Sequence, residues 1–391
     1  MQAVQIRPNI YWVGAIDWSM RNFHGYQTGR GSTYNAYLIG DGENVTLIDT
    51  VKAEFADELI ARISSVIDPA KINLIVSSHV EPDHSSALPI VAKIVPDAKI
   101  VTSNPNGLKG LTARYGNLNY QPVKAGDEIK IGSRTLKFVP TPMLHWPDSM
   151  VTYCPEEKIL FSNDAFGQHL ATSARFDDEN DLETILFEAK KYYANILMPF
   201  GKQAQAAIQT LSGLEIEMLA TGHGIIWRKN ISTIIECYKK WSAGEVENRA
   251  VIVFDSMWHS TEIMAREITE AFQSKNIPAQ FFDIKHNHLS DIVTEIFTSK
   301  YLAVGSPTIN NGMMPTIASL LCYLKGLQPK NHRAFAFGSY GWGGQSIGLV
   351  EDELKSIGCE IFVDKIRIAN VPTKEQLDEM SKKIQDALGA E

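Results

Sequence analysis

Residues 72–84 read INLIVSSHVEPDH, a short apolar run followed by a cluster of potential metal ligands. The apolar part is rich in β-branched side chains, which predicts a buried strand. Directly after it come His79, Glu81, Asp83 and His84. The alternate spacing of the first three would turn their side chains to one side of an extended loop. A solvated polar loop is the competing interpretation, but four potential ligands within six residues favour a metal site.

Three further potential ligands lie beside other strand-like runs. His145 lies in TPMLHWPDS, Asp164 in KILFSNDAF, and His223 in LATGHGIIW, between small residues that leave room for an ion. Together with the first cluster they make four histidines and three carboxylates. This set suits two metal ions that share one bridging carboxylate, for which Asp164 is the candidate.

The first 249 residues read as mixed β and α structure. Residues 34–50 and 127–142 each place two apolar runs around a turn that contains glycine, which predicts hairpins. Residues 181–196 and 232–244 have the apolar spacing of amphipathic helices. We therefore expect a first domain over residues 1–249.

From residue 250 onward, strands and helices alternate strictly. Five strand-like runs, beginning with AVIVFDS at 250–256, are each followed by a helical run. This alternation predicts an α/β domain with a doubly wound parallel sheet over residues 250–391.

Ligands of such sheets bind outside the carboxyl ends of the strands, and three loops are expected there. A helix start with hydroxyls and backbone N–H groups suits a phosphate, while glycines and aromatics suit a flat ring. An ordinary α/β domain with polar loops is the competing interpretation. GxGxxG is absent, so a dinucleotide site has no support. The candidate cofactor-binding residues are Ser256, Met257, Trp258, His259, Ser260 and Thr261; Ser306, Pro307, Thr308, Ile309, Asn310 and Asn311; and Ser339, Tyr340, Gly341, Trp342, Gly343 and Gly344.

Composition excludes several classes of protein. The 391 residues carry 37 basic and 45 acidic side chains, a net charge of −8 that disfavours nucleic acid and anionic membranes as partners. No run approaches the ~18 apolar residues of a membrane span, and the N-terminus lacks the features of a signal peptide. The four cysteines form no CxxC pair, which excludes a thiolate zinc or iron site of the rubredoxin type, and four scattered cysteines in a chain this long fit a reducing compartment. We expect a soluble cytoplasmic protein.

The order HxExDH, His145, Asp164, His223 resembles the metallo-β-lactamase superfamily. Zinc hydrolases of that superfamily carry HxHxDH, and the glutamate at position 81 is typical of the flavodiiron proteins, also called rubredoxin:oxygen oxidoreductases. The resemblance covers the whole chain. It implies a metallo-β-lactamase-like αββα sandwich followed by a flavodoxin-like five-stranded sheet that binds FMN. The segments that carry it include MLHWPDSMVTY, NDAFGQHLATS, YYANILMPF, GHGIIWRK, VGSPTINN and FGSYGWGG.

The resemblance also implies roles for the ligands. Carboxylate oxygens are harder than imidazole and favour iron or manganese over zinc, and an oxide or hydroxide bridge would offset the ferric charge. In some members, the residue that matches His84 is turned away from the metal. His24 and Tyr193 resemble residues that line the substrate pocket and could donate a hydrogen bond to an intermediate. On the family pattern, one iron is held by His79, Glu81 and His145, the other by Asp83, His84 and His223, with Asp164 between them.

The implied activity is reduction of dioxygen to water, of nitric oxide to nitrous oxide, or of both. Two ferrous ions and reduced FMN store the four electrons that dioxygen requires. The family pattern implies a head-to-tail homodimer, with a dimer of dimers as an alternative. Because the chain carries no rubredoxin or reductase extension, we expect a separate electron donor, such as rubredoxin or a reduced deazaflavin. The alternatives are a zinc hydrolase with a flavodoxin-like docking domain and a flavin sensor without metals.

Overall fold

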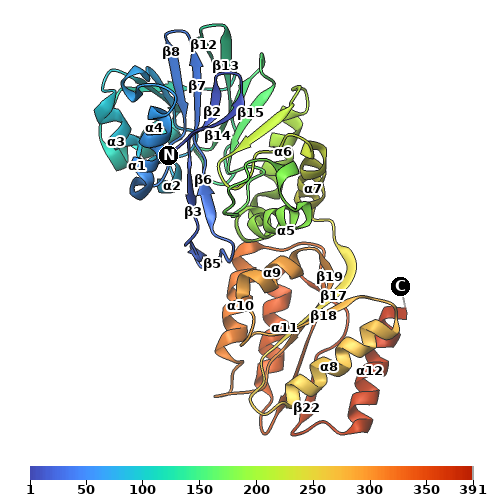
Figure 1. The fold of residues 1–391 in the computed structure, drawn as a ribbon. Helices are drawn as coiled ribbons and strands as arrows, with labels where there is room; N and C mark the ends of the chain where they lie inside the picture. Colours follow the sequence, from blue (N-terminus) through green and yellow to red (C-terminus); the bar gives the residue numbers. More distant parts are fainter. Residues whose placement is uncertain (390–391) are drawn as a thin grey trace. The chain divides into compact units, whose positions relative to one another are not determined.

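The computed structural model describes residues 1–389, which form two compact units (Figure 1). The first unit consists of Met1–His24, Thr28–Tyr192 and Lys202–Lys239, and the second of Gly25–Gln27, Tyr193–Gly201 and the chain from Lys240 onward. Residues 240–249 thus group with the second unit. The division between residues 249 and 250 was drawn from sequence motifs, and it stays a prediction.

Two large sheets form the first unit. Antiparallel pairing on one side of the larger sheet, from β1 to β8, gives way to parallel pairing from β8 to β11. In spatial order its strands are β1 (Val4–Arg7), β2 (Ile10–Trp12), β7 (Tyr37–Asp41), β8 (Asn44–Ile48), β9 (Leu74–Val76), β10 (Lys99–Ser103) and β11 (Tyr120–Val123). The other sheet contains β12 (Glu128–Ile131), β13 (Arg134–Pro140), β14 (Met150–Cys154), β15 (Ile159–Asn163) and β16 (Met218–Thr221). Both expected hairpins are present, as β7–β8 and β12–β13.

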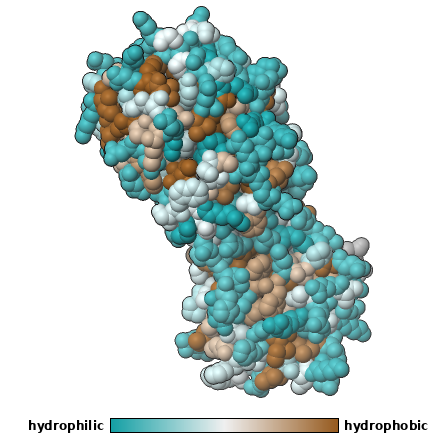
Figure 2. All heavy atoms as spheres, viewed as in Figure 1, coloured by the Kyte–Doolittle hydropathy of each residue, from teal (hydrophilic) through white to brown (hydrophobic). Residues whose placement is uncertain are grey.

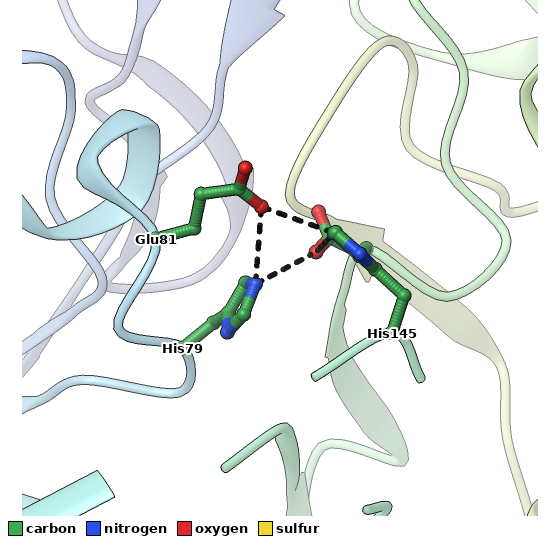
Figure 3. Close-up of side chains that lie close together, drawn as sticks. His79, Glu81 and His145 are labelled. Atoms are coloured by element: carbon green, nitrogen blue, oxygen red, sulfur yellow. Dashed lines mark hydrogen bonds and ion pairs between the residues drawn. The ribbon is translucent and has the colours of Figure 1, made fainter. Parts of the chain in front are cut away.

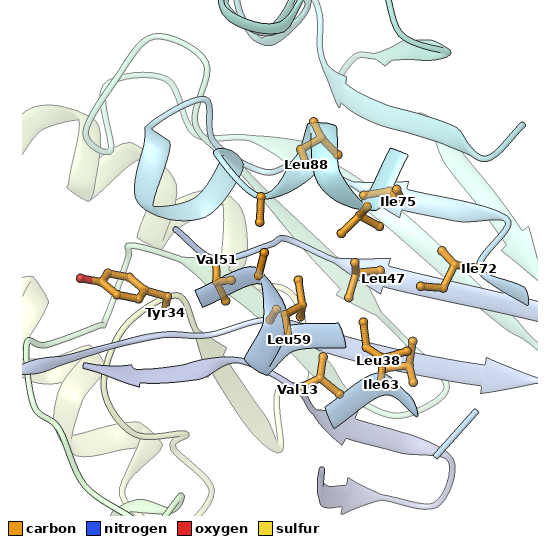
Figure 4. Close-up of a cluster of buried hydrophobic side chains, with 14 of the residues drawn as sticks. Val13, Tyr34, Leu38, Leu47, Val51, Leu59, Ile63, Ile72, Ile75 and Leu88 are labelled. Carbon is orange, nitrogen blue, oxygen red and sulfur yellow. The ribbon is translucent and has the colours of Figure 1, made fainter. Parts of the chain in front are cut away.

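The larger sheet is buried on both faces, as its strand sequences require. Leu47 and Ile75 face a cluster with Leu59 of the helical layer (Figure 4), whereas their neighbours Ile48 and Val76 face a cluster between the two sheets. Successive residues of a strand point to opposite faces, so continuous apolar runs are needed for this sandwich.

Helices cover the outer faces of both sheets, and the layers are therefore helix, sheet, sheet and helix (Figure 1). This is the expected αββα sandwich. The short strand β3 (Ala15–Asp17) pairs with β6 (Ser32–Tyr34), and β4 (Asn22–Phe23) pairs with β5 (Tyr26–Gln27). The helices are α1 (Ala56–Ser64), α2 (Pro82–Ser85), α3 (Leu88–Ile94), α4 (Asn106–Tyr115), α5 (Leu182–Tyr192), α6 (Gly201–Leu211) and α7 (Ile231–Ala243).

A single parallel sheet organises the second unit, in the order β18-β17-β19-β20. Two short strands, β21 and β22, pair in turn with β20 and together fill the fifth position. This is the predicted doubly wound five-stranded arrangement, with its edge strand split in two. The strands are β17 (Glu247–Phe254), β18 (Ala279–Asp283), β19 (Ser299–Gly305), β20 (Arg333–Tyr340), β21 (Glu360–Ile361) and β22 (Ile366–Ala369).

Helices lie on both faces of this sheet, with α8 and α12 together on one face (Figure 1). The helices are α8 (Ser260–Ser274), α9 (Leu289–Phe297), α10 (Pro315–Leu327), α11 (Gln345–Ile357) and α12 (Lys374–Gly389). Within residues 1–389, no helix is both long enough and apolar enough to cross a membrane. Figure 2 shows a largely hydrophilic surface on which hydrophobic residues form separate patches.

Candidate functional site

The candidate ligands lie in loops and one short helix that follow strands of the sandwich. His79 and Glu81 come from the loop after β9, and Asp83 and His84 lie in α2. Pro82 occupies the first position of α2, where its missing N–H costs nothing. The carbonyl of Glu81 accepts hydrogen bonds from the backbone N–H groups of His84 and Ser85, each at 3.0 Å. This single turn buries both Asp83 and His84.

His79, Glu81, His145 and Asp164 form the first ligand group. Glu81 Oε2 lies 3.0 Å from His145 Nε2 and 3.3 Å from His79 Nε2 (Figure 3). Asp164 Oδ2 lies 3.4 Å from His145 Nε2 and 3.6 Å from His79 Nε2. Two imidazole nitrogens and two carboxylate oxygens therefore converge on one point.

The second group consists of Asp83, His84 and His223. His223 Nε2 lies 3.2 Å from Asp83 Oδ2. The other oxygen of Asp164, Oδ1, lies 2.9 Å from His84 Nε2 and 3.4 Å from His223 Nε2. Asp164 thus directs one oxygen to each group, as a bridging carboxylate does. His84 points toward the centre and not away from it.

Small residues and buried charge shape this centre. A side chain on Gly222 would meet His84 Cε1 at 2.9 Å, so only glycine leaves room for this imidazole.

Burial opposes the ionised form of Asp164, but His84, His145 and His79 hold its pKa well below the usual range. Burial likewise lowers the pKa of His79, yet hydrogen bonds to Asp148 and Glu81 raise it to about 10. Such a cluster of ionised pairs fits cation binding, because a metal can replace the protons that the imidazoles share with carboxylates.

One oxygen supports the metal interpretation independently. Asp83 Oδ1 is buried and makes no hydrogen bond within residues 1–389. A buried, unsatisfied carboxylate oxygen is costly unless another ligand is bound there. The donor set therefore fits two metal ions.

Hydrogen bonds behind the ligands fix the orientation of two imidazoles. Asp148 Oδ2 lies 2.9 Å from His79 Nδ1 and also accepts the Val80 N–H at 2.6 Å. The carbonyl of Thr33 lies 2.6 Å from His223 Nδ1. Both contacts leave Nε2 facing the centre. Neither partner was predicted from the sequence, although Asp148 stands three residues after His145.

The two predicted pocket residues have different surroundings. His24 Nε2 lies 3.0 Å from Glu81 Oε1, and its side chain is 73% exposed. Tyr193 instead stacks on Phe297, with ring centroids 5.4 Å apart, within the second unit. The preceding residue, Tyr192, is fully buried with its ring 5.1 Å from His169 and 6.2 Å from His223.

Tyr192, rather than Tyr193, therefore lies beside the ligand set. Neighbouring residues of a helix point about 100° apart, so only one of the two can face the centre. The helix α5 ends at Tyr192 and is followed by a π-helical turn, Tyr193–Leu197, which carries Tyr193 into the second unit.

In the second unit, the three predicted loops meet beyond the carboxyl ends of β17, β19 and β20. They enclose a cavity of about 550 Å³ and a smaller one of about 240 Å³. Asn370 and Val371, which follow β22, also line the smaller cavity and were not expected from the sequence. The larger cavity is lined by Met257, Trp258, Thr308, Ile309, Asn310, Asn311, Gly341 and Trp342. The loop residues that line the smaller cavity are Ser256, Met257, Trp258, Ser260, Pro307, Thr308, Ser339, Tyr340 and Gly341.

The loop residues that do not line either cavity make contacts within the loops or with neighbouring residues. Thr261 Oγ1 and Ser339 Oγ lie 3.0 Å apart, and Ser306 Oγ accepts the Met314 N–H at 2.9 Å. His259 Nδ1 lies 2.9 Å from Glu262 Oε2. Gly343 and Gly344 adopt positive φ at the start of α11.

The cavities fit a flavin mononucleotide. Trp258 and Trp342 are 86% and 83% exposed beside the larger cavity, where a flat ring could cover them. Ser256 Oγ is buried and has no hydrogen-bond partner in the described part of the chain. An unsatisfied hydroxyl near the start of α8 fits a phosphate group.

Comparisons with known proteins agree with both halves of the fold. The model of the ODP family beta lactamase matches residues 33–224, and that of flavodoxin matches residues 252–383. A nitric oxide reductase of Moorella thermoacetica is 44% identical over 93% of this chain and 92% of its own length. A rubredoxin-oxygen oxidoreductase of Megalodesulfovibrio gigas is 42% identical over 100% of this chain and 99% of its own.

Solved structures are similarly close. The rubredoxin oxygen:oxidoreductase from Desulfovibrio gigas superimposes with a TM-score of 0.96 at 41% identity, covering 100% of this chain and 98% of that chain. The flavodiiron protein from Giardia intestinalis gives a TM-score of 0.95 at 36% identity, covering 100% and 97%. The sandwich and the flavodoxin-like sheet expected from the sequence are confirmed.

Proposed function

This chain belongs to the flavodiiron proteins, and from that membership we propose how its own residues reduce dioxygen, nitric oxide or both. The protein is an oxidoreductase of this family, with relatives named for nitric oxide reduction and for oxygen reduction. The zinc hydrolase and the flavin sensor considered above therefore lose their support. The observation that carries the assignment of the site is the position of Asp164, whose two oxygens face two separate ligand groups.

We propose that the two groups hold two non-heme irons with an oxide or hydroxide bridge. The three carboxylates favour iron over zinc, and the converging Nε2 and carboxylate atoms supply its ligands. The proposed ligands are His79, Glu81 and His145 for one iron, Asp83, His84 and His223 for the other, and Asp164 for both.

The loops of the second unit are proposed to bind FMN. Ser256 and the start of α8 would hold the phosphate, while Trp258 and Trp342 would cover the ring. When bound, the two irons and FMN supply up to four electrons, which is enough to reduce dioxygen to two waters. Two electrons are enough to reduce two molecules of nitric oxide to nitrous oxide and water.

The chain's own side chains then orient ligands and hold protons. Asp148 and the Thr33 carbonyl keep Nδ1 of their histidines engaged, so Nε2 stays directed at the centre. His24 Nε2 lies 3.0 Å from Glu81 Oε1 and its side chain is largely exposed, so it can donate a hydrogen bond to a reduced substrate beside this ligand. The hydroxyl of Tyr192 is kept protonated, since burial raises its pKa well above the usual value. We propose that Tyr192 has the role that the sequence suggested for Tyr193.

The finer statements about partners are proposals as well. We propose a separate electron donor, such as rubredoxin or a reduced deazaflavin; the name of one relative couples rubredoxin to oxygen. A head-to-tail homodimer, or a dimer of two such dimers, is proposed from the family pattern. A cytoplasmic location is proposed because four scattered cysteines in a chain of 391 residues fit a reducing compartment.

The test is the metal and flavin content of the purified protein, followed by anaerobic turnover with each gas. We expect about two irons and one FMN per chain, and consumption of dioxygen or nitric oxide with a reduced rubredoxin as donor. Zinc in both positions, from cells with ample iron, would contradict the proposal.

A further inference from the structure

The loop proposed to bind the FMN phosphate is supported from beneath by a buried carboxylate. Asp255 follows β17 directly, precedes the loop, and is 1% exposed. Its Oδ2 accepts a hydrogen bond from the hydroxyl of Thr316, in the first turn of α10. Its backbone N–H donates to the carbonyl of Gly305 at 3.1 Å. Asp255 is therefore fixed in the interior, next to the first loop residue, Ser256.

Lys285, from the loop after β18, contacts both residues. Its Nζ donates to the carbonyl of Ser256 at 2.6 Å and lies 3.6 Å from Asp255 Oδ1. A second carboxylate, Asp283, is 4.0 Å away. The side chain of Lys285 is 43% exposed, whereas that of Asp255 is buried. The partly exposed ammonium group of Lys285 thus lies beside the buried carboxylate of Asp255.

The position of this pair matters because the expected ligand is itself an anion. A phosphate dianion close to an uncompensated buried carboxylate would be repelled through a medium of low dielectric. Within residues 256–261, the only ionisable side chain is His259, and its Nδ1 lies 2.9 Å from Glu262 Oε2. Lys285 is the cation that contacts both Asp255 and the loop backbone.

We propose that Lys285 is a positioning residue for FMN, which neutralises Asp255 and holds the Ser256 carbonyl so that the loop can accept a phosphate. The inference rests on the proposed FMN site. Fixing the Ser256 carbonyl leaves the buried Ser256 Oγ, which lacks a partner in the described chain, free to contact the phosphate. The hydroxyl of Thr316 donates to the other carboxylate oxygen of Asp255, Oδ2, and so fixes the orientation of this side chain beneath the loop.

The test measures dissociation of FMN from the full-length holoprotein on dilution, followed by the recovery of flavin fluorescence. We expect Lys285→Met to weaken FMN binding about tenfold. Lys285→Arg, which keeps the charge, should bind FMN nearly as wild type does. The double variant Asp255→Asn/Lys285→Met should regain most of the affinity, because the repelling carboxylate is gone and Asn keeps a partner for Thr316.

Lys325→Met is the matched control. Lys325 lies in α10 of the same unit and donates to Glu353 Oε2 at 3.2 Å, away from the cofactor loops. It should release FMN as wild type does. Equal affinity in wild type and Lys285→Met would overturn the inference alone, as would a double variant as weak as Lys285→Met. Wild-type protein that binds no FMN would overturn the cofactor assignment as well.

Discussion

Replacing Asp148 with asparagine should loosen the metal centre without touching a ligand. Asp148 Oδ2 accepts the Val80 N–H at 2.6 Å and lies 2.9 Å from His79 Nδ1. Asparagine keeps the size of the side chain and one acceptor oxygen but removes the charge. The Nδ1 proton of His79 then loses a charge-assisted bond, and its Nε2 becomes a weaker and less well oriented donor.

The expected loss is roughly 10- to 100-fold in iron affinity, or about 1.4–2.7 kcal/mol, the usual cost of removing a partner behind a metal-bound histidine. The assay is anaerobic competition for ferrous iron between the full-length protein and a chelator of known affinity. FMN content of the same samples reports whether the second unit is folded.

Asp41→Asn is the control for this experiment. Asp41 Oδ2 also accepts two hydrogen bonds, from the backbone and hydroxyl of Ser133 at 2.7 and 2.6 Å, but at a hairpin of the sandwich. The iron affinity of the Asp41→Asn variant should equal that of the wild-type protein. If Asp148→Asn also retained wild-type affinity, the reasoning about His79 would be refuted.

Two further predictions concern a tyrosine and a buried histidine. Tyr192→Phe should lower the turnover of dioxygen or nitric oxide by about 10- to 100-fold, because the hydrogen bond from its hydroxyl to the reduced intermediate is lost, whereas Tyr193→Phe should leave turnover unchanged. The opposite ranking in steady-state assays would reverse our assignment. Burial lowers the pKa of His332 to about 4 in the folded protein, whereas in the unfolded chain it is near 6.5. Between pH 6.5 and pH 4, therefore, His332 binds a proton in the unfolded chain but not in the folded protein. Its contribution to stability is therefore complete above pH 6.5 and is lost as pH falls toward 4, by up to about 3 kcal/mol, and the urea midpoint of His332→Gln should fall less between pH 7 and pH 4.5 than that of wild type.

Much of the site could be predicted because its ligands are local and chemically distinctive. His79, Glu81, Asp83 and His84 stand within six residues, and a strand before them fixes their position. Strict alternation after residue 250 predicted the parallel sheet for the same reason: the strand and helix periods can be read in short windows.

What the sequence could not predict depends on contacts between distant segments. Thr33 reaches His223 across 190 residues, and no local pattern marks a backbone carbonyl as a partner. The choice between Tyr192 and Tyr193 depends on where α5 ends and the π-helical turn begins, a boundary that apolar spacing does not define. Asn370 was missed because the fifth strand-like run was predicted as one strand, whereas it is split into β21 and β22, and the loop after β22 was not counted among the cofactor loops.

The most direct test of the central claim is a crystal structure of the protein as purified, with anomalous scattering recorded on both sides of the iron absorption edge. We expect two iron peaks, one on each side of Asp164, with His79, Glu81 and His145 around one and Asp83, His84 and His223 around the other. A single peak, or peaks that appear only at the zinc edge, would contradict it.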